Sequence, residues 1–320
     1  MKYCRALAVV LTGLPLGTVK AEQKSQNIVV VKVVFDTLTA AIAQLQSVDY
    51  TNVSEAKNSP IYKEVHPSAI GSSGRTVEMN FQAHGKKFRY HQKLTEYDGG
   101  GVRSREYAYD GKKYQYFNDN LGVLSVQETD PQNGYFALAL FNSFNQFGFL
   151  LAQLGDNQNS IDLGLLSSPQ AWQRSFAGAK FLRYEEMEGE QCIVLQFPGG
   201  MDRFFRVSCN YLVYFSPKHK FFPIAWKSVS EKGRVLLDYR VTEVGSVPLG
   251  SGSFFYPRKS VTTEYTAKGY AADMSQVTVE SEIKSFTVNS IASDEIFTLD
   301  ALKANERVDL DKNGVVPTPR

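Results

Sequence analysis

Bulky apolar residues alternate with polar ones along most of the chain, at the period of two that is typical of β-strands. The longest such stretch runs from residue 203 to residue 244 and is broken by turns that contain Pro or Gly. It predicts three strands, at 203–216, 221–229 and 234–244. Long neighbouring strands rich in aromatic and β-branched residues favour a curved antiparallel sheet. Such a sheet either closes over a core or holds an apolar ligand.

A second group of strands is predicted nearer the N-terminus. These strands lie at 75–82, 87–97, 105–109, 112–117 and 123–127. Strands resume at Phe181 and continue to about Val288. Residues 51–74 are rich in Asn, Ser, Pro and Gly and predict a long loop.

A helical insert is predicted between the two groups of strands, at about residues 136–176. Its first part has apolar residues at spacings of three and four, which indicates an amphipathic helix with a broad aromatic face. The residues of this face are Leu140, Phe141, Phe144, Phe147 and Leu151. Ser168-Pro169-Gln170 begins a second short helix, because proline suits the first helical turn.

The N-terminal residues have the features of a targeting segment. Lys2 and Arg5 precede an apolar stretch at 6–16, and Val19-Lys20-Ala21 has the small-x-small pattern of a cleavage site. This pattern predicts a secretory signal peptide at 1–21, cleaved after Ala21, and a protein of the periplasm or otherwise exported. The alternative is a buried N-terminal helix. No later stretch approaches the roughly 20 apolar residues of a membrane span.

The segment after the predicted signal, residues 27–46, favours a helix through its alanines and leucines, although residues 29–34 are β-branched and favour a strand. We predict a helix there. The remaining chain, 22–320, is predicted to form a single domain, because neither group of strands is large enough for a comfortable domain of its own.

The net charge gives no reason to expect a nucleic acid partner. The chain has 35 Lys and Arg residues against 33 Asp and Glu, a formal charge of +2. Lys2, Arg5 and Lys20 leave with the predicted signal, so 35 minus three leaves 32 basic residues and a net charge of about −1.

Two cysteines follow the predicted signal, and a disulfide between them is predicted. If Gly200 and Met201 are the centre of a hairpin turn, Cys192 lies opposite Cys209. Directly opposed residues have Cβ atoms ~4.5–5.5 Å apart, close to disulfide geometry. An exported protein also meets an oxidising compartment. The alternative is two small buried thiols.

The sequence contains no pattern that is typical of a catalytic site. The serines of Gly71-Ser72 and Gly250-Ser251-Gly252 lack a G-x-S-x-G context. The glutamates at 185, 186, 188 and 190 fit a solvated strand end and turn around Gly189 better than a pair of catalytic carboxylates. We therefore predict a protein that is not an enzyme and has no cofactor; a hydrolase is the minor alternative.

Metal sites are also not predicted. The four histidines are His66, His84, His91 and His219, and none has the close spacing of zinc ligands. Residues 309–314 read D-x-D-x-N-G, the first half of a calcium loop, but the twelfth position is Arg320 instead of Glu. A hairpin turn explains this segment better.

Several short segments together resemble a known family. They are Phe88-Arg89-Tyr90-His91, Tyr109-Asp110-Gly111-Lys112, Tyr214-Phe215-Ser216-Pro217-Lys218, Phe222-Pro223-Ile224 and Asp294-Glu295-Ile296-Phe297-Thr298-Leu299. In this order, after an exported start and an N-terminal helix, they resemble the periplasmic outer-membrane lipoprotein carrier (LolA-like) family, as a longer exported member. Carriers of the family have an Arg-Pro pair just before the segment that matches Phe88–His91, whereas this region here reads His84-Gly85-Lys86-Lys87.

The resemblance implies a mainly β (α+β) fold: an open, strongly curved antiparallel half-barrel with helices covering its concave face. It also implies a non-enzymatic function, in which a hydrophobic cavity holds a lipid or the acyl chain of a lipoprotein. The aromatic face of the insert is then a candidate lining of the cavity. Candidates from the sheet are Phe205, Val207, Tyr211 and Val213. The alternative is an interaction module with a filled core that docks another envelope protein.

Overall fold

The computed structural model describes most of the sheet and the helices that border it. The described residues are 16–65, 73–84, 87–97, 101–127, 176, 178–201, 208–265, 275–291, 293–299 and 306–309. The helices are α1 (Leu16–Ile42) and α2 (Pro60–Val65), with two 3-10 turns, η1 (Pro217–His219) and η2 (Asp294–Phe297). The strands of the first half are β1 (Ser47–Asn58), β2 (Gly74–His84), β3 (Lys87–Glu96), β4 (Val102–Tyr109), β5 (Tyr114–Asn118) and β6 (Val123–Gln127). Those of the second half are β7 (Lys180–Met187), β8 (Glu190–Met201), β9 (Ser208–Ser216), β10 (Phe222–Ser230), β11 (Val235–Leu249), β12 (Gly252–Tyr265), β13 (Ser275–Val288) and β14 (Glu306–Asp309).

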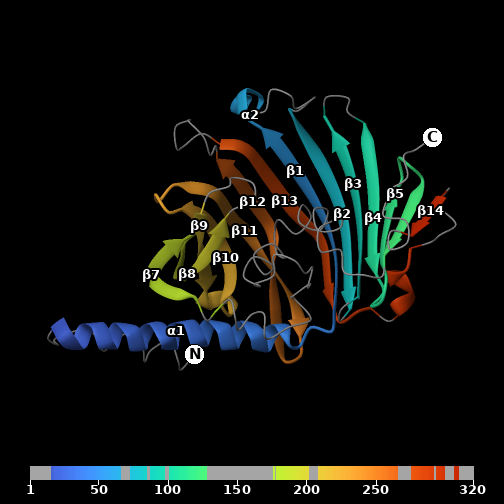
Figure 1. The fold of residues 1–320 in the computed structure, drawn as a ribbon. Helices are drawn as coiled ribbons and strands as arrows, with labels where there is room; N and C mark the ends of the chain where they lie inside the picture. Colours follow the sequence, from blue (N-terminus) through green and yellow to red (C-terminus); the bar gives the residue numbers. More distant parts are fainter. Residues whose placement is uncertain are drawn as a thin grey trace.

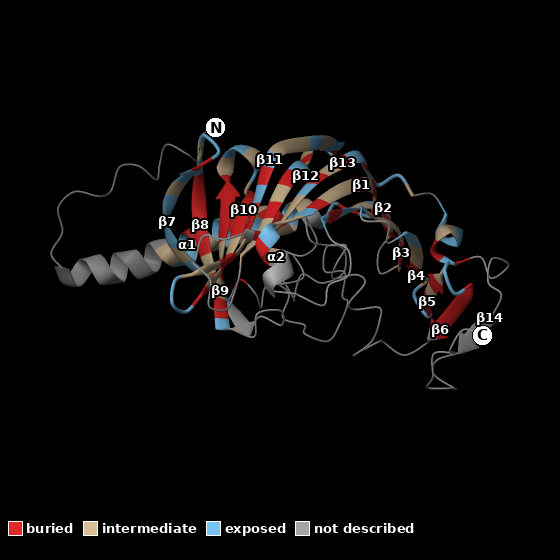
Figure 2. Cartoon of the chain, turned by 90° about the horizontal axis from the view of Figure 1, so that it is seen from above, coloured by how far each residue is buried: buried red, intermediate tan, exposed pale blue. Residues whose placement is uncertain are grey.

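All of these strands belong to one 14-stranded sheet, in the order β14-β6-β5-β4-β3-β2-β1-β13-β12-β11-β10-β9-β8-β7. Every neighbouring pair is antiparallel except β14 and β6, which run parallel. The sheet is open, with β14 and β7 as its edges, and it curves into an arch (Figures 1 and 2). The prediction of a mostly β, open antiparallel sheet is confirmed.

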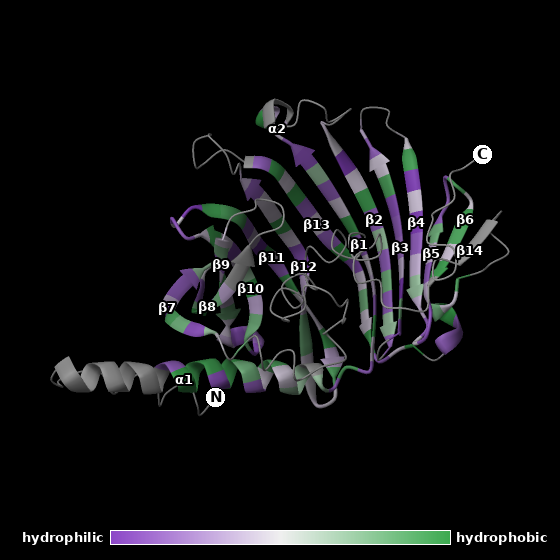
Figure 3. Cartoon of the chain, viewed as in Figure 1, coloured by the Kyte–Doolittle hydropathy of each residue, from purple (hydrophilic) through white to green (hydrophobic). Residues whose placement is uncertain are grey.

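The two faces of the sheet differ in chemistry, as the alternating colours along the strands in Figure 3 show. In β3, Phe88 and Tyr90 are buried, while Arg89 between them and His91 after them are only half-buried. The cross-strand pairs of Tyr90 are Phe81 on β2 and Tyr107 on β4, and both are buried. We call this apolar side the concave face. Each large side chain buried there contributes roughly 1.5–3 kcal/mol.

Helix α1 lies beside the β7 end of the sheet, across the lower ends of the strands in Figure 1. Val30, Val34 and Leu38, spaced by one helical turn, are buried in the same core as the concave face. The predicted helix at 27–46 is confirmed up to Ile42. The helix begins at Leu16, so the predicted cleavage point lies within it, and the signal peptide remains a prediction. None of the described helices is long and apolar enough to cross a membrane.

One part of the predicted fold was wrong and another part is untested. The predicted loop at 51–74 contains most of β1, a central strand paired with β2 and β13 along nearly its whole length. The predicted cover of helices over the concave face remains a prediction, since the described helices are α1 beside β7 and α2 beside β13. The helical insert lies outside the described residues, apart from a helical Phe176.

Candidate functional site

A row of directly opposed residues crosses five strands on the concave face. Its members are Tyr239 on β11, Trp226 on β10, Val213 on β9, Leu195 on β8 and Phe181 on β7. The first four are at most 2% exposed. Trp226 stacks on Tyr239 with ring centroids 6.1 Å apart. The row forms a continuous apolar track that leads towards α1.

An apolar cleft of about 390 Å³ lies at the α1 end of this track. Its lining residues are Asn27, Ile28, Val31, Lys32, Phe35, Phe176 and Ala179. The volume is within the range of roughly 300–1,000 Å³ that is usual for ligand sites. Most of the lining is apolar, and its polar members are Asn27 and Lys32.

Aromatic contacts and one hydrogen bond hold the cleft together. The Phe176 ring lies 5.3 Å from the Phe35 ring and 5.1 Å from the Phe197 ring of β8, in an edge-on arrangement with the latter. The main-chain N–H of Phe181 donates to Oδ1 of Asn27 at 2.6 Å, which ties α1 to the edge strand β7. The cleft is therefore built on a helix and a sheet, both of which are anchored.

The structure places only some of the predicted ligand-binding residues. Tyr211 and Val213 lie on the concave face and are buried, 7% and 0% exposed. Phe205, Val207, Leu140, Phe141, Phe144, Phe147 and Leu151 lie outside the described residues. A role in ligand binding remains a prediction for all nine. The sequence reasoning identified the helix at 27–46 but not its cleft, which depends on a contact with Phe176, far away in sequence.

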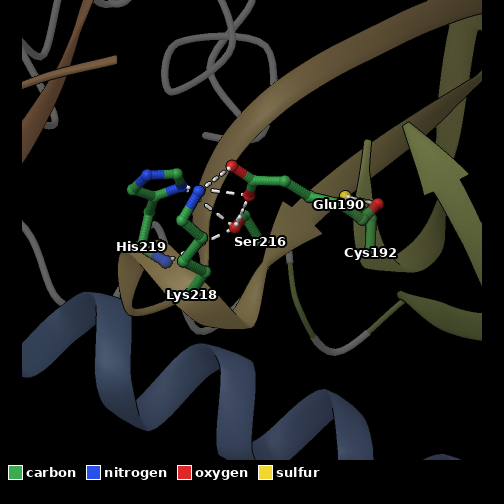
Figure 4. Close-up of polar contacts among 5 residues, drawn as sticks. All are labelled: Glu190, Cys192, Ser216, Lys218 and His219. Atoms are coloured by element: carbon green, nitrogen blue, oxygen red, sulfur yellow. Dashed lines mark hydrogen bonds and ion pairs between the residues drawn. The ribbon is translucent and has the colours of Figure 1, made fainter. Parts of the chain in front are cut away.

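A serine, a histidine and a glutamate do meet, at the turn between β9 and β10 (Figure 4). The Ser216 hydroxyl donates to Oε2 of Glu190 at 2.6 Å, and Nδ1 of His219 lies 3.0 Å from the same hydroxyl. A catalytic histidine contacts serine and carboxylate through different ring nitrogens. Here Nδ1 of His219 faces both, since it is also 3.2 Å from Glu190. Ser216 is fully buried and caps η1, so this cluster holds the turn in place.

The negative charge of Glu190 also helps to hold the turn between β9 and β10 in place. Burial alone would raise the pKa of its carboxyl group, but hydrogen bonds from Ser216 and Lys218 and the nearby charges of His219 and Lys218 lower it overall. Lys218 Nζ donates to Oε1 at 2.9 Å. Within the described parts of the chain, His, Cys, Asp and Glu side chains do not gather in a group of three that is able to hold a metal ion.

The predicted Cys192–Cys209 disulfide is wrong. Both cysteines are free and buried. The β8–β9 register pairs Leu195 with Val213, so Cys192 lies seven positions along β8 from the level of Cys209. At ~3.3 Å per residue this is about 23 Å. Cys192 is an odd number of positions from Leu195, whereas Cys209 is an even number of positions from Val213. Because side chains alternate between the faces of a strand, the two thiols point to opposite faces of the sheet.

We expect both thiols to remain unreactive in the folded protein and to react fully after unfolding without a reductant. Burial raises the pKa of the Cys192 thiol to about 11, with the charges of Glu190 and Glu185 adding to the effect. Mass spectrometry after alkylation in denaturant, with and without prior reduction, tests this. Two alkylated thiols in both samples are expected, and a difference between the samples would contradict the observed register.

Comparisons with known proteins give similarities of fold. No family model matches the chain, and no curated protein matches it. Among solved structures, it is similar to a DUF1329 family protein from Desulfovibrio piger, at 8% identity and a TM-score of 0.47 over 84% of this chain and 97% of the other. It is also similar to an outer membrane lipoprotein-sorting protein domain from Vibrio parahaemolyticus, at 10% identity and a TM-score of 0.44 over 84% and 97%.

A LolA superfamily protein from Nitrosomonas europaea is similar at 14% identity and a TM-score of 0.40, over 82% of this chain and 96% of the other. The structural neighbours thus include the family that the sequence resembles. The identities and scores are low, so the likeness itself assigns no function.

Proposed function

We propose that this chain is an exported, non-enzymatic binding protein of the periplasm that holds a lipid or the acyl chain of a lipoprotein. The observation that supports this most directly is the apolar cleft between α1 and Phe176. It opens beside a buried apolar track that continues over four further strands of the concave face. Burial of an acyl chain contributes about 0.8 kcal/mol per CH₂ group, so such a surface suits transport of acyl groups through water.

A filled-core interaction module is the second candidate. The observation that favours it is the burial of the track itself, where Val213 and Leu195 are 0% exposed. In that case the cleft is a surface feature, and the chain docks another protein of the envelope. The two candidates differ in whether the purified protein contains a lipid.

Native mass spectrometry of the protein, exported and purified without detergent, distinguishes them. We expect a bound mass that denaturation releases as lipid. Val31 lines the cleft, so Val31→Trp fills it, and we expect the lipid-bound fraction to fall by about tenfold, which corresponds to ~1.4 kcal/mol.

Val33→Trp is the matched control, because Val33 is on the same helix but 45% exposed and outside the cleft lining. We expect it to retain lipid like the original chain. A bare protein in every sample would favour the filled-core module. Equal loss in both variants would show that the cleft is not the binding site.

A further inference from the structure

Strand β7 forms one edge of the sheet (Figure 1). Among the described strands, β8 is its one neighbour. It is eight residues long, whereas β14 at the other edge has four. Its middle is accessible, since the Arg183 side chain is 49% exposed and Tyr184 is 41% exposed. The outer side of an edge strand presents main-chain N–H and C=O groups that can pair with a strand of another chain.

The charges of β7 are arranged so that the strand is complementary to itself. Its first half contains Lys180 and Arg183, and its second half contains Glu185 and Glu186. When two such strands pair antiparallel, the basic half of each lies beside the acidic half of the other. Opposite charges across a strand pair are stabilising, and like charges are destabilising. A two-fold interface needs a self-complementary surface, so this order of charges fits a second copy of this chain.

The faces of β7 limit where the two-fold axis can lie. Tyr184 is opposite Ile193, two positions from Leu195 of the apolar track, and its ring lies 5.1 Å from that of Phe181. Tyr184 is therefore on the concave face. Arg183 and Glu185 are on the other face, where Nε of Arg183 donates to Oε2 of Glu185 at 2.7 Å.

Pairing that keeps each face continuous requires the axis to pass through a residue and not between two residues. An axis at Arg183 would oppose two arginines, and an axis at Glu185 would oppose two glutamates. An axis at Tyr184 places Arg183 of each copy opposite Glu185 of the other. It also brings the two Tyr184 rings together on the concave side, where an aromatic pair is favourable.

We propose that β7 pairs antiparallel with β7 of a second copy of this chain, about a two-fold axis at Tyr184. The two sheets then form one continuous sheet, with both concave faces on the same side. The apolar track ends at Phe181 in each copy. In the dimer it continues through Phe181 and Tyr184 of one copy to Tyr184 and Phe181 of the other.

Opposite charge reversals in the full chain test this arrangement, with native mass spectrometry and sedimentation as the measurements. We expect the original chain to form a dimer. Glu185→Arg makes positions 183 and 185 both basic, and Arg183→Glu makes both acidic. Each variant alone should dimerise at least about tenfold more weakly, because like charges are then opposed at two places. An equal mixture of the two variants should restore a dimer with one copy of each, identified by its mass, since every reversed charge then faces an opposite one.

Glu282→Arg is the matched control. Glu282 forms an ion pair with Lys284, two residues along β13, and its side chain is 35% exposed against 32% for Glu185. However, β13 is an interior strand that pairs with β1 and β12, so this variant should dimerise like the original chain. A monomeric original chain, or a dimer that survives either reversal in β7, would overturn the proposal. Failure of the mixed variants to form the mixed dimer would overturn it as well.

Discussion

Trp226→Ala is expected to lower the free energy of unfolding by about 3–5 kcal/mol. Trp226 is 1% exposed and is the second residue of the apolar track, between Tyr239 and Val213. Its ring stacks on the Tyr239 ring and is in a T-shaped arrangement with the Tyr211 ring, with the centroids of this second pair 6.0 Å apart. Removal of the indole leaves a cavity that the neighbours fill poorly, because the ladders with β9 and β11 fix the strands on both sides. Denaturant unfolding followed by circular dichroism measures the loss.

Leu182→Ala is the control for this substitution. Leu182 is 40% exposed on the edge strand β7, so its removal should change stability by no more than about 0.5 kcal/mol. A small loss for Trp226→Ala, similar to that of Leu182→Ala, would mean that the concave face is loosely packed around the indole. That result would contradict the burial of the track.

Strands in which apolar and polar residues alternate could be predicted from the sequence, because this alternation ends where the turn residues begin. Strands β2, β3 and β10 begin and end within about two residues of the predicted ranges. Strand β1 was missed because its sequence, SVDYTNVSEAKN, is polar. Its buried positions include two polar residues, Ser47 and Asn52. A strand with polar residues on both faces has no hydrophobic period, and only its pairing with β2 and β13 reveals it.

The cysteine prediction failed for a different reason. A strand at 203–216 was predicted around Cys209, and β9 lies within that range, but the register of the two cysteines was taken from an assumed turn at Gly200 and Met201. In the structure β8 continues to Met201, and β9 is described from Ser208, with Met201 opposite Ser208. Register depends on loop length and turn type, which a Gly-Gly pair alone does not fix. The predicted and observed registers differ by an odd number of positions. The two cysteines therefore lie on opposite faces of the sheet, and not on the same face as predicted.

The candidate site was predictable in kind but not in position. Apolar patterning indicated an apolar surface on a curved sheet, and Tyr211 and Val213 lie on one face of β9, but their role in ligand binding stays a prediction. The cleft depends on a contact between segments far apart in the sequence, that of Phe35 with Phe176. No local pattern predicts contacts of this kind.

Glu190→Ala is expected to destabilise the protein by about 1–3 kcal/mol at neutral pH, because it leaves the buried Ser216 hydroxyl without its acceptor. The effect should depend on pH. The pKa of the Glu190 carboxyl is lower in the folded protein than its ordinary value of 4.5. The charged form is therefore favoured by folding, and its contribution is fully present above that ordinary value and is lost as the pH falls through the folded pKa.

Unfolding free energies of the original chain and of Glu190→Ala, measured from neutral pH down to about pH 3, should thus converge at the acidic end. Glu188→Ala is the matched control, since Glu188 is in the same hairpin with a side chain 48% exposed and only a 4.0 Å approach to Arg240. We expect little change at any pH for this variant. A stability gap for Glu190→Ala that stays constant, or that widens as the pH falls, would show that the Glu190 carboxylate is not what anchors the β9–β10 turn to β8.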